Sequence, residues 1–247
     1  MHLAAASPPD GYMFMLTSTA YGHLLNKKDA KGIEYSKSYE PVALIGLGDS
    51  VLTVHPTLPV KNVKELIALA KKNPGQLNYS SSGIGGFPHM NTELFKLMTG
   101  TDIVHVPFQG GGPAAADTMA GNTQMNLGSV PSLMGYIRSG RLKALGVGAT
   151  KRNPQLPDVP TITEAGYAGA DFITWNGVHT RAGTPKSVVA KLNAELNRLL
   201  KLSDVQERML ALGLDPAGGT PEAFGIFVRQ DIARWAKVIK EANVRVD

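Results

Sequence analysis

The sequence predicts an α/β fold in which short apolar strands alternate with helices around mostly parallel sheets. Between residues 77 and 149, apolar runs of strand length recur with helix-like segments between them. Loops rich in glycine, serine or proline separate each run from the next helix. An order of strand, loop, helix and strand is typical of right-handed βαβ units, whose strands lie parallel.

The first third of the chain predicts three strands and one helix. After the turn PPDG, residues 12–16 form an apolar run that ends in the hydroxyl-rich letters TST. Residues 42–47 and 51–54 form two further apolar runs. Residues 63–72 carry apolar side chains at helical spacing and stop at the letters NPG.

The middle of the chain repeats this unit, and its final third is more helical. Strands are expected at 77–80, 103–107, 124–128 and 142–149, and helices at 88–98, 113–120 and 131–139. Two further helices are expected from Thr184-Pro185 to about residue 201 and from Pro221 to about residue 242, because a hydroxyl cap followed by proline starts a helix. Phe224, Phe227 and Trp235 recur at helical spacing and are expected in the core.

The composition allows one large domain or two, and it excludes several classes of site. The 247 residues are 43% hydrophobic and 18% charged, and no apolar run approaches the length of a membrane span. There is no cysteine, which excludes disulfides, thiolate metal sites and a cysteine nucleophile. The net charge of +5 suits an anionic ligand, while the scattered lysines and arginines argue against nucleic acid. The first residues do not form a signal peptide, so the chain is either cytosolic or begins after a removed or absent segment.

Three loops have the composition of ligand-binding loops. They are TSTA after the first strand, SSSGIGG before the helix at 88–98, and QGGG before the helix at 113–120. Ligands of open parallel sheets bind at the carboxyl ends of strands, where free helix amides favour an anion by about 0.3–1 kcal/mol per charge. The alternative is that these glycines only make tight turns. His89 would contact the ligand or the loop, or pack; Trp175 and Phe108 would line the site or belong to the core.

Enzyme motifs are absent from the sequence. It contains no GxxxxGK[ST], GxSxG or GxGxxG segment, and its six histidines never fall at HxxxH or HxH spacing. We therefore expect no cofactor, no metal and no catalysis. The alternative from another class is a hydrolase or transferase that uses the serine loop for acyl or phosphoryl transfer.

Several motifs together resemble the receptors of tripartite tricarboxylate transporters, the Bug or TctC-like family of periplasmic solute-binding proteins. They lie at residues 9–12, 39–45, 64–70, 74–83, 104–110, 156–161 and 182–185. The resemblance implies a two-lobed type II periplasmic-binding fold that closes on its ligand as a hinged clamp. It implies one lobe of residues 1–55 and 177–247 and another of residues 56–176, with crossovers near Val54-His55 and Asn176-Gly177.

The resemblance also implies a function and a site. The protein would be a periplasmic receptor that binds a small dicarboxylate, tricarboxylate or aromatic acid and delivers it to membrane transporter subunits. Carried over position by position, the ligand-binding residues would be Ser18, Thr19, Ser81, Ser82, Gly83, His89, Phe108, Gln109, Gly110, Gly128 and Ser129. Trp175 is added as a candidate wall of the cleft.

The chain departs from the family pattern in two places. The family's N-terminal segment, with the first strand and first helix of lobe one, is expected to be missing. The alternatives are then a non-binding or partner-assembling relative, and self-association in place of the expected monomer. Gly128 stands where many relatives carry an acidic residue, which favours an anionic ligand over an amino acid or amide.

Overall fold

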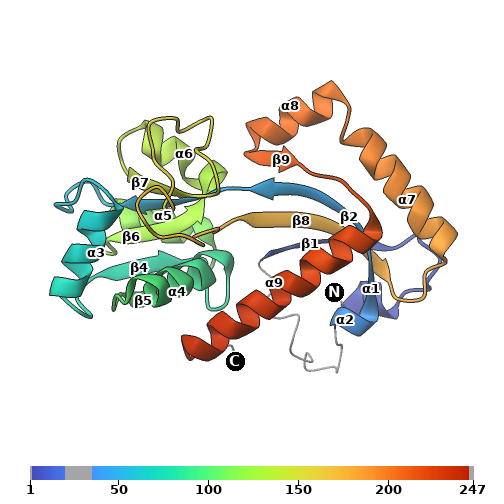
Figure 1. Cartoon of the computed structure of the whole chain (residues 1–247), viewed down its shortest axis with the longest axis horizontal. Coiled ribbons are helices and arrows are strands. Elements are labelled where there is room, and N and C mark those ends of the chain that lie inside the picture. The colour runs from blue at the N-terminus through green and yellow to red at the C-terminus, as the bar shows by residue number, and fades with distance from the viewer. Residues whose placement is uncertain (1, 20–34, 245–247) are drawn as a thin grey trace. The chain divides into compact units, whose positions relative to one another are not determined.

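The computed structural model describes residues 2–19 and 35–244, and these form two compact units (Figure 1). The first unit contains residues 1–47 and 175–237, and the second contains residues 48–174 and 238–247. The α/β fold expected from the sequence is confirmed. Each unit has its own sheet and its own hydrophobic core.

The first unit is built on a four-stranded sheet in the order β1-β8-β2-β9. Its strands are β1 (Phe14–Ser18), β2 (Tyr39–Gly48), β8 (Thr174–Arg181) and β9 (Leu214–Pro216), and its helices are α1 (His2–Ala6), α2 (Tyr35–Ser38), α7 (Lys186–Leu199), α8 (Ser203–Ala211) and most of α9 (Pro221–Glu241). Strand β1 runs antiparallel to β8, with Phe14 opposite Thr180 and Ser18 opposite Asn176. The expected strand at 12–16 thus lies two residues further along, and β8, β9, α1, α2 and α8 were not predicted.

The core of the first unit is organised around Trp175. Its ring packs edge-on against Phe224 of α9 at 5.7 Å between centroids. Its Nε1 donates to Oδ2 of Asp231 at 2.8 Å, and Nε1 of Trp235 donates to Oδ1 of the same carboxyl at 3.0 Å. Burial raises the pKa of Asp231, and the two indole hydrogen bonds oppose that shift. The carboxylate therefore ties β8 to α9 from inside the core.

The second unit is built on a five-stranded sheet in the order β5-β4-β6-β3-β7. Its strands are β3 (Ser50–Val54), β4 (Asn78–Ser81), β5 (Val104–Pro107), β6 (Met125–Ser129) and β7 (Lys143–Gly148), and its helices are α3 (Val63–Lys72), α4 (Phe87–Thr99), α5 (Gly111–Met119) and α6 (Val130–Arg138). All of these elements were predicted, with bounds that differ by at most two residues from those observed. The side chain of Asn62 caps α3 by accepting from the backbone N–H of Glu65 at 2.9 Å.

The sheet of the second unit is mostly parallel, as expected, but β3 runs against its neighbours. Strand β4 is parallel to β5 and β6, but β3 is antiparallel to both β6 and β7. The strands joined by α4, α5 and α6 run parallel, as in βαβ units, whereas β3 runs opposite to β4 although α3 connects them. The first stretch of the first unit ends at Leu47 and the second unit begins at Gly48, so that β3 pairs within the second sheet. The expected division into two lobes that clamp a ligand stays a prediction.

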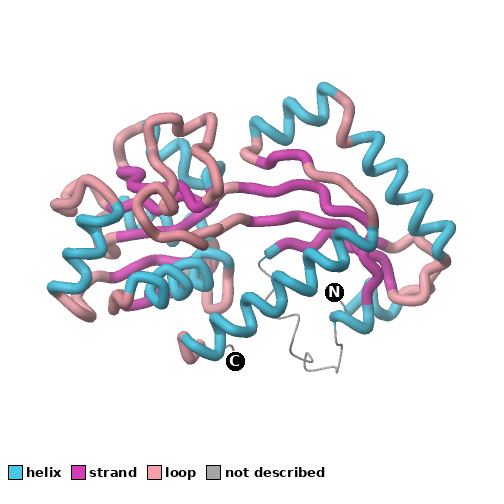
Figure 2. Tube along the Cα trace, in the orientation of Figure 1, coloured by secondary structure: helices cyan, strands magenta, loops and turns pink. Residues whose placement is uncertain are grey.

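Helices cover both faces of this sheet, as Figure 2 shows with strands in magenta and helices in cyan. Alternate residues of β3 belong to different cores, since Leu52 packs with α3 and α4 while Val51 packs with α5 and α6.

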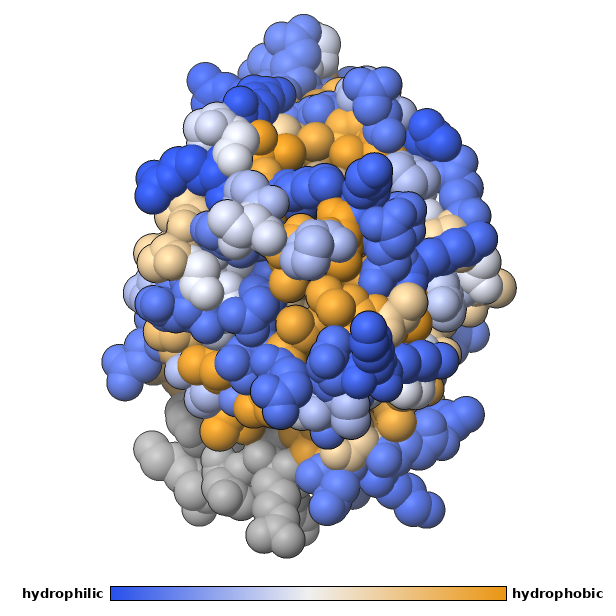
Figure 3. All heavy atoms as spheres, turned by 90° about the vertical axis from the view of Figure 1, so that its left-hand side faces the viewer, coloured by the Kyte–Doolittle hydropathy of each residue, from blue (hydrophilic) through white to orange (hydrophobic). Residues whose placement is uncertain are grey.

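The face shown in Figure 3 has apolar side chains gathered near its middle with polar ones around them. Exposed apolar surface of this kind is usual in folded proteins. Among the described residues, none of the helices combines the length and the hydropathy that a membrane span needs.

A substitution at Gly177 tests the packing of β8 against α9. A Cβ at this position would overlap the ring of Phe224. We expect Gly177→Ala to lower the free energy of unfolding by about 1–3 kcal/mol, as overpacked cores generally do. Urea unfolding followed by circular dichroism measures the change.

The matched control is Gly135→Ala on α6, where an added Cβ meets no atom within 4 Å. This variant should be neutral or slightly more stable, because alanine favours a helix over glycine. Equal stability of Gly177→Ala and the wild type would contradict the packing described here.

Candidate functional site

A pocket of about 250 Å³ lies in the second unit, where strands of its sheet end and the following helices begin. It is lined by Ser82, Phe87, Pro88, Gly111, Ala114, Asn126, Gly128, Ser129, Ser132 and Leu133. Because β5, β4 and β6 are neighbouring parallel strands, their carboxyl ends meet at one edge of the sheet. The loops that leave these ends lead directly to the N-termini of α5, α4 and α6.

The N-termini of these helices leave their first amides without side-chain caps. Gly86, Gly110 and Ser129 are the N-caps of α4, α5 and α6, and none of these three makes a side-chain cap hydrogen bond within the described range 35–244. The hydroxyl of Ser129 instead donates to Oγ of Ser132 at 2.9 Å. The first amides of a helix have no partner within the helix, so uncapped N-termini can donate to an anion.

Glycine gives the loops the backbone shape that this arrangement needs. Gly83, Gly85 and Gly110 have φ of 127°, 73° and 110°, a region that other residues rarely adopt. A Cβ on Gly86 would lie 2.9 Å from Oγ of Ser82. A Cβ on Gly128 would lie 2.8 Å from Oδ1 of Asn126 and 3.0 Å from Leu133, so Gly128 keeps this wall of the pocket open.

A buried chain of polar side chains holds the floor of the pocket. Nδ2 of Asn126 on β6 donates to Oγ of Ser80 on β4 at 2.8 Å. That hydroxyl also bonds Oγ1 of Thr118 on α5 at 2.7 Å, and Thr118 bonds Thr123 at 2.9 Å. These hydrogen bonds join two strands and a helix, so they fix the spacing of the elements from which the pocket is built.

The electrostatic character of the pocket comes from backbone dipoles rather than from charged side chains. Across the described range 35–244, the residues that line it include no aspartate, glutamate, lysine or arginine. Amides and hydroxyls would therefore hold an anion, while Phe87, Ala114 and Leu133 offer apolar contact for its carbon chain. The arrangement suits reversible binding of a small organic acid.

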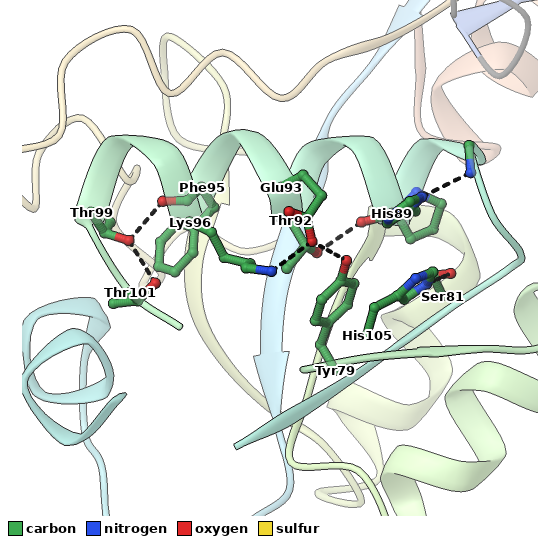
Figure 4. A network of polar contacts seen from close by, with 12 residues as sticks. Tyr79, Ser81, His89, Thr92, Glu93, Phe95, Lys96, Thr99, Thr101 and His105 are labelled. Carbon is green, nitrogen blue, oxygen red and sulfur yellow. Dashed lines mark hydrogen bonds and ion pairs between the residues drawn. The ribbon is translucent and has the colours of Figure 1, made fainter. Parts of the chain in front are cut away.

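Two stacked histidines support the loop between β4 and α4 (Figure 4). The rings of His89 and His105 lie 3.9 Å apart at 7°, and the ring of Tyr79 lies 4.8 Å from that of His105. Nδ1 of His89 accepts from the backbone N–H of Gly85 at 2.8 Å. Nε2 of His105 bonds Oγ of Ser81 at 2.6 Å. Both rings are thus hydrogen-bonded to the loop that reaches the pocket.

Burial keeps both histidines neutral. It lowers the pKa of His89, a shift that Glu93 opposes and Lys96 reinforces. It lowers the pKa of His105 to about 3, with His89 and Lys96 adding to the shift. Burial also raises the pKa of Tyr79, whose hydroxyl donates to Oε1 of Glu93 at 2.7 Å. The Glu93 carboxylate also forms an ion pair with Nζ of Lys96 at 2.8 Å.

The structure brings together part of the predicted site in the second unit. Ser82, Gly128 and Ser129 line the pocket, and Gly110 is the N-cap of α5. Ser81 is fully buried and accepts from the backbone N–H of Gly83, and its carbonyl accepts from the N–H of Phe108 at 2.9 Å. His89 is 6% exposed and bonds the loop, which is one of the two roles considered for it. Gln109 is exposed beside Gly110.

The other predicted residues lie in the first unit. Ser18 pairs with Asn176 at the end of β1, and Oγ1 of Thr19 accepts from the backbone N–H of Trp175 at 2.8 Å. Trp175 itself is 1% exposed and belongs to the core around Phe224. The structure therefore corrects its assignment as a wall of the cleft, because the indole is closed off by α9.

Six pocket residues were not predicted from the sequence, and Gly111 was predicted only as part of the QGGG loop. The six are Phe87, Pro88, Ala114, Asn126, Ser132 and Leu133. The residues at the helix starts could have been found, since each follows a predicted strand and loop. Asn126 gave no such signal, because a polar residue inside a buried strand is recognised only when its partner Ser80 is known.

The fold and the site together are typical of solute-binding proteins, and comparison with known sequences defines the family. Residues 1–244 match the model of the tripartite tricarboxylate transporter family receptor, TctC. The chain belongs to this family, which consists of substrate-binding receptors. The expected resemblance is confirmed.

Several members of the family are similar over nearly the whole chain. The protein of the tcbD–tcbE intergenic region of a Pseudomonas species is 37% identical, over 99% of this chain and 73% of its own length. BugT of Bordetella pertussis is 32% identical over 98% of this chain and 75% of its own length.

Solved structures show the same relationship. An R. palustris protein solved with adipate is 32% identical, with a TM-score of 0.87 over 98% of this chain and 81% of its own. MatC of Rhodopseudomonas palustris, solved with malate, is 30% identical, with a TM-score of 0.82 over 96% of this chain and 82% of its own. The periplasmic binding protein BugD is 31% identical, with a TM-score of 0.84 over 98% of this chain and 82% of its own.

The buried histidines predict a dependence of stability on pH. The pKa of His105 is about 3 in the folded chain, so below its ordinary value of 6.5 the unfolded chain binds more protons. The free energy of unfolding should therefore fall as pH falls from about 6.5 toward 3, by at most about 1.4 kcal/mol per pH unit for each such histidine. Urea unfolding at pH 7 and pH 4.5 measures the slope.

His105→Gln should flatten this slope, because it removes a ring whose pKa is lowered by burial. His179 contributes the same trend from the first unit, because burial lowers its pKa to about 3. A slope that is the same in His105→Gln and in the wild type would show that His105 does not titrate as described.

Proposed function

We propose that this protein is a periplasmic receptor that binds a small carboxylate and delivers it to the membrane subunits of a transporter. The observation that carries the proposal is the meeting of three uncapped helix N-termini, those of α4, α5 and α6, at one pocket in the described part of the second unit. Backbone amides there supply donors for carboxylate oxygens. The family membership supports the transport role.

The ligand is proposed to be a di- or tricarboxylate or an aromatic acid. Relatives at 32% and 30% identity were solved with adipate and with malate, both of which are small dicarboxylates. The neutral lining of the pocket supports the same class of ligand. Amide and hydroxyl donors attract a carboxylate, and without a charged side chain they also allow its release. We propose Ser82, Gly128 and Ser129, with the amides that follow Gly86 and Gly110, as the contacts in the second unit.

Catalysis by the serine loop is disfavoured by the environment of its hydroxyls. Oγ of Ser81 lies 2.6 Å from Nε2 of His105, a separation that a nucleophile and its base could have. Ser81 is fully buried, however, so no substrate reaches its hydroxyl. The pKa of His105, lowered to about 3 by burial, also makes the ring a poor proton acceptor. We propose that the chain binds and releases its ligand unchanged.

Titration calorimetry against adipate, malate, citrate and benzoate tests the proposal. We expect saturable 1:1 binding of at least one acid, with the acid recovered chemically unchanged. At 100 times the Kd, binding should stabilise the folded chain by about 2.7 kcal/mol, which a thermal-shift assay detects. Neither heat nor thermal shift with any of the four acids would count against the receptor, and turnover of the acid would favour an enzyme.

Introduction of a negative charge at Gly128 tests the placement of the carboxylate. Gly128→Asp should weaken binding of the acid found above at least about tenfold, equivalent to 1.4 kcal/mol, because it sets a carboxylate beside the ligand. Gly128→Asn is the matched control, since it has the same size without the charge. Affinities of both variants equal to that of the wild type would place the carboxylate elsewhere.

The oligomeric state is proposed to be monomeric. Size-exclusion chromatography with light scattering should give a mass near 26.3 kDa. A stable dimer would instead favour the alternative of a relative that assembles with a partner.

A further inference from the structure

We propose that His89 and His105 are positioning residues that hold the loop of residues 81–86 in its binding shape through a stack of two neutral imidazole rings. The inference rests on the proposed function for its link to ligand affinity. Its structural part concerns the loop alone.

The loop reaches the pocket and is held at two points from outside it. Ser82 lines the pocket, and Gly86 is the uncapped N-cap of α4. His89, in the first turn of α4, accepts the N–H of Gly85 at Nδ1. His105, on β5, bonds Oγ of Ser81, and that hydroxyl lies 3.2 Å from the backbone nitrogen and 3.2 Å from the carbonyl oxygen of Gly83.

The contact with Gly85 fixes the protonation state of His89. A backbone N–H donates, so Nδ1 of His89 must carry a lone pair and the single ring proton must lie on Nε2. Addition of a second proton at Nδ1 converts this acceptor into a donor and breaks the contact. The loop shape at Gly85 therefore requires a neutral ring.

The stack makes His89 and His105 dependent on each other. With ring centroids 3.9 Å apart, two imidazolium ions would repel strongly at a largely buried position. Tyr79 of β4 stacks on His105. Glu93 and Lys96 of α4 are the charged groups that act on the stacked rings. Glu93 is already bonded to the Tyr79 hydroxyl and to Lys96 at 2.8 Å, so it is engaged on both sides.

The stack also spans the elements that carry the loop. Tyr79 belongs to β4, His105 to β5 and His89 to α4 (Figure 4). The loop connects β4 to α4, so the stack joins the two elements at the ends of the loop to β5. Ring contact alone would provide packing, whereas the two hydrogen bonds determine which way Gly83 and Gly85 face.

Two variants at His89 distinguish the effect of its hydrogen-bond acceptor from the effect of its ring packing. His89→Phe keeps a flat ring in the stack but has no acceptor for Gly85, while His89→Gln keeps an acceptor and loses the ring. We expect His89→Phe to lower the protection of the Gly85 amide against hydrogen exchange at least tenfold. The measurement is made by NMR without ligand at pH 7. His89→Gln should retain more of it. His55→Phe, at a histidine outside the stack, should change nothing.

A pH profile supplies a readout that simple packing would not move. Protection of Gly85, corrected for the intrinsic exchange rate, should fall more steeply with decreasing pH below 6.5 in the wild type than in His89→Gln, because only the wild type has a titrating ring at this position. Retained protection in His89→Phe, or a wild-type profile no steeper than that of His89→Gln, would overturn the proposal.

Calorimetry with adipate and malate then tests the link to binding. We expect His89→Phe to weaken binding at least tenfold and His89→Gln to weaken it less. If neither acid binds the wild type while exchange at Gly85 responds as expected, the proposed function fails and the positioning role stands. If His89→Phe loses protection yet binds as tightly as the wild type, the role of the stack in binding is wrong.

Discussion

The parallel pairing of β5, β4 and β6 is the constraint on which the rest of the second unit depends. Parallel neighbours bring their carboxyl ends to one edge, so the helices that follow must begin side by side. Residues at the starts of these helices then line one pocket. The hydrogen bonds of Asn126 and Thr118 with Ser80 keep these elements at a fixed spacing, because a buried hydroxyl left without a partner would cost about 1–3 kcal/mol.

The site is therefore made mostly of backbone. Glycine stands at five positions where a side chain or an ordinary φ would close the loops, and serine supplies hydroxyls without charge. A pocket of this kind would bind through the dipoles of backbone amides and hydroxyls. These groups are held in place by the fold, so they need little rearrangement when the ligand leaves. Fixed charges would hold an anion more tightly, at the expense of release to a transporter. The neutral lining is consistent with a receptor that must do both.

How far the sequence alone was sufficient differs between the two units. The helix at 63–72 was predicted to its ends because the apolar spacing and the stop at Asn73-Pro74-Gly75 are both local signals. Strand β8 was missed because its letters TWNGVHTR show neither clear alternation nor an unbroken apolar run. Its place in the sheet comes from pairing with β1, more than 150 residues away in the chain. Local sequence patterns do not predict pairing with so distant a strand.

The sequence by itself determined the α/β class, the family and the glycine-rich loops, since these depend on periodicity, turn residues and motifs that lie close together in the chain. Only the tertiary structure decided that β3 runs antiparallel in the second sheet, that Trp175 is core, and that His89 and His105 stack. Each of these depends on a contact between distant segments, and the energy of such a contact is set by burial and geometry that no single segment contains. The glycine-rich loops can thus be recognised in the sequence, whereas the contacts that hold them in place cannot.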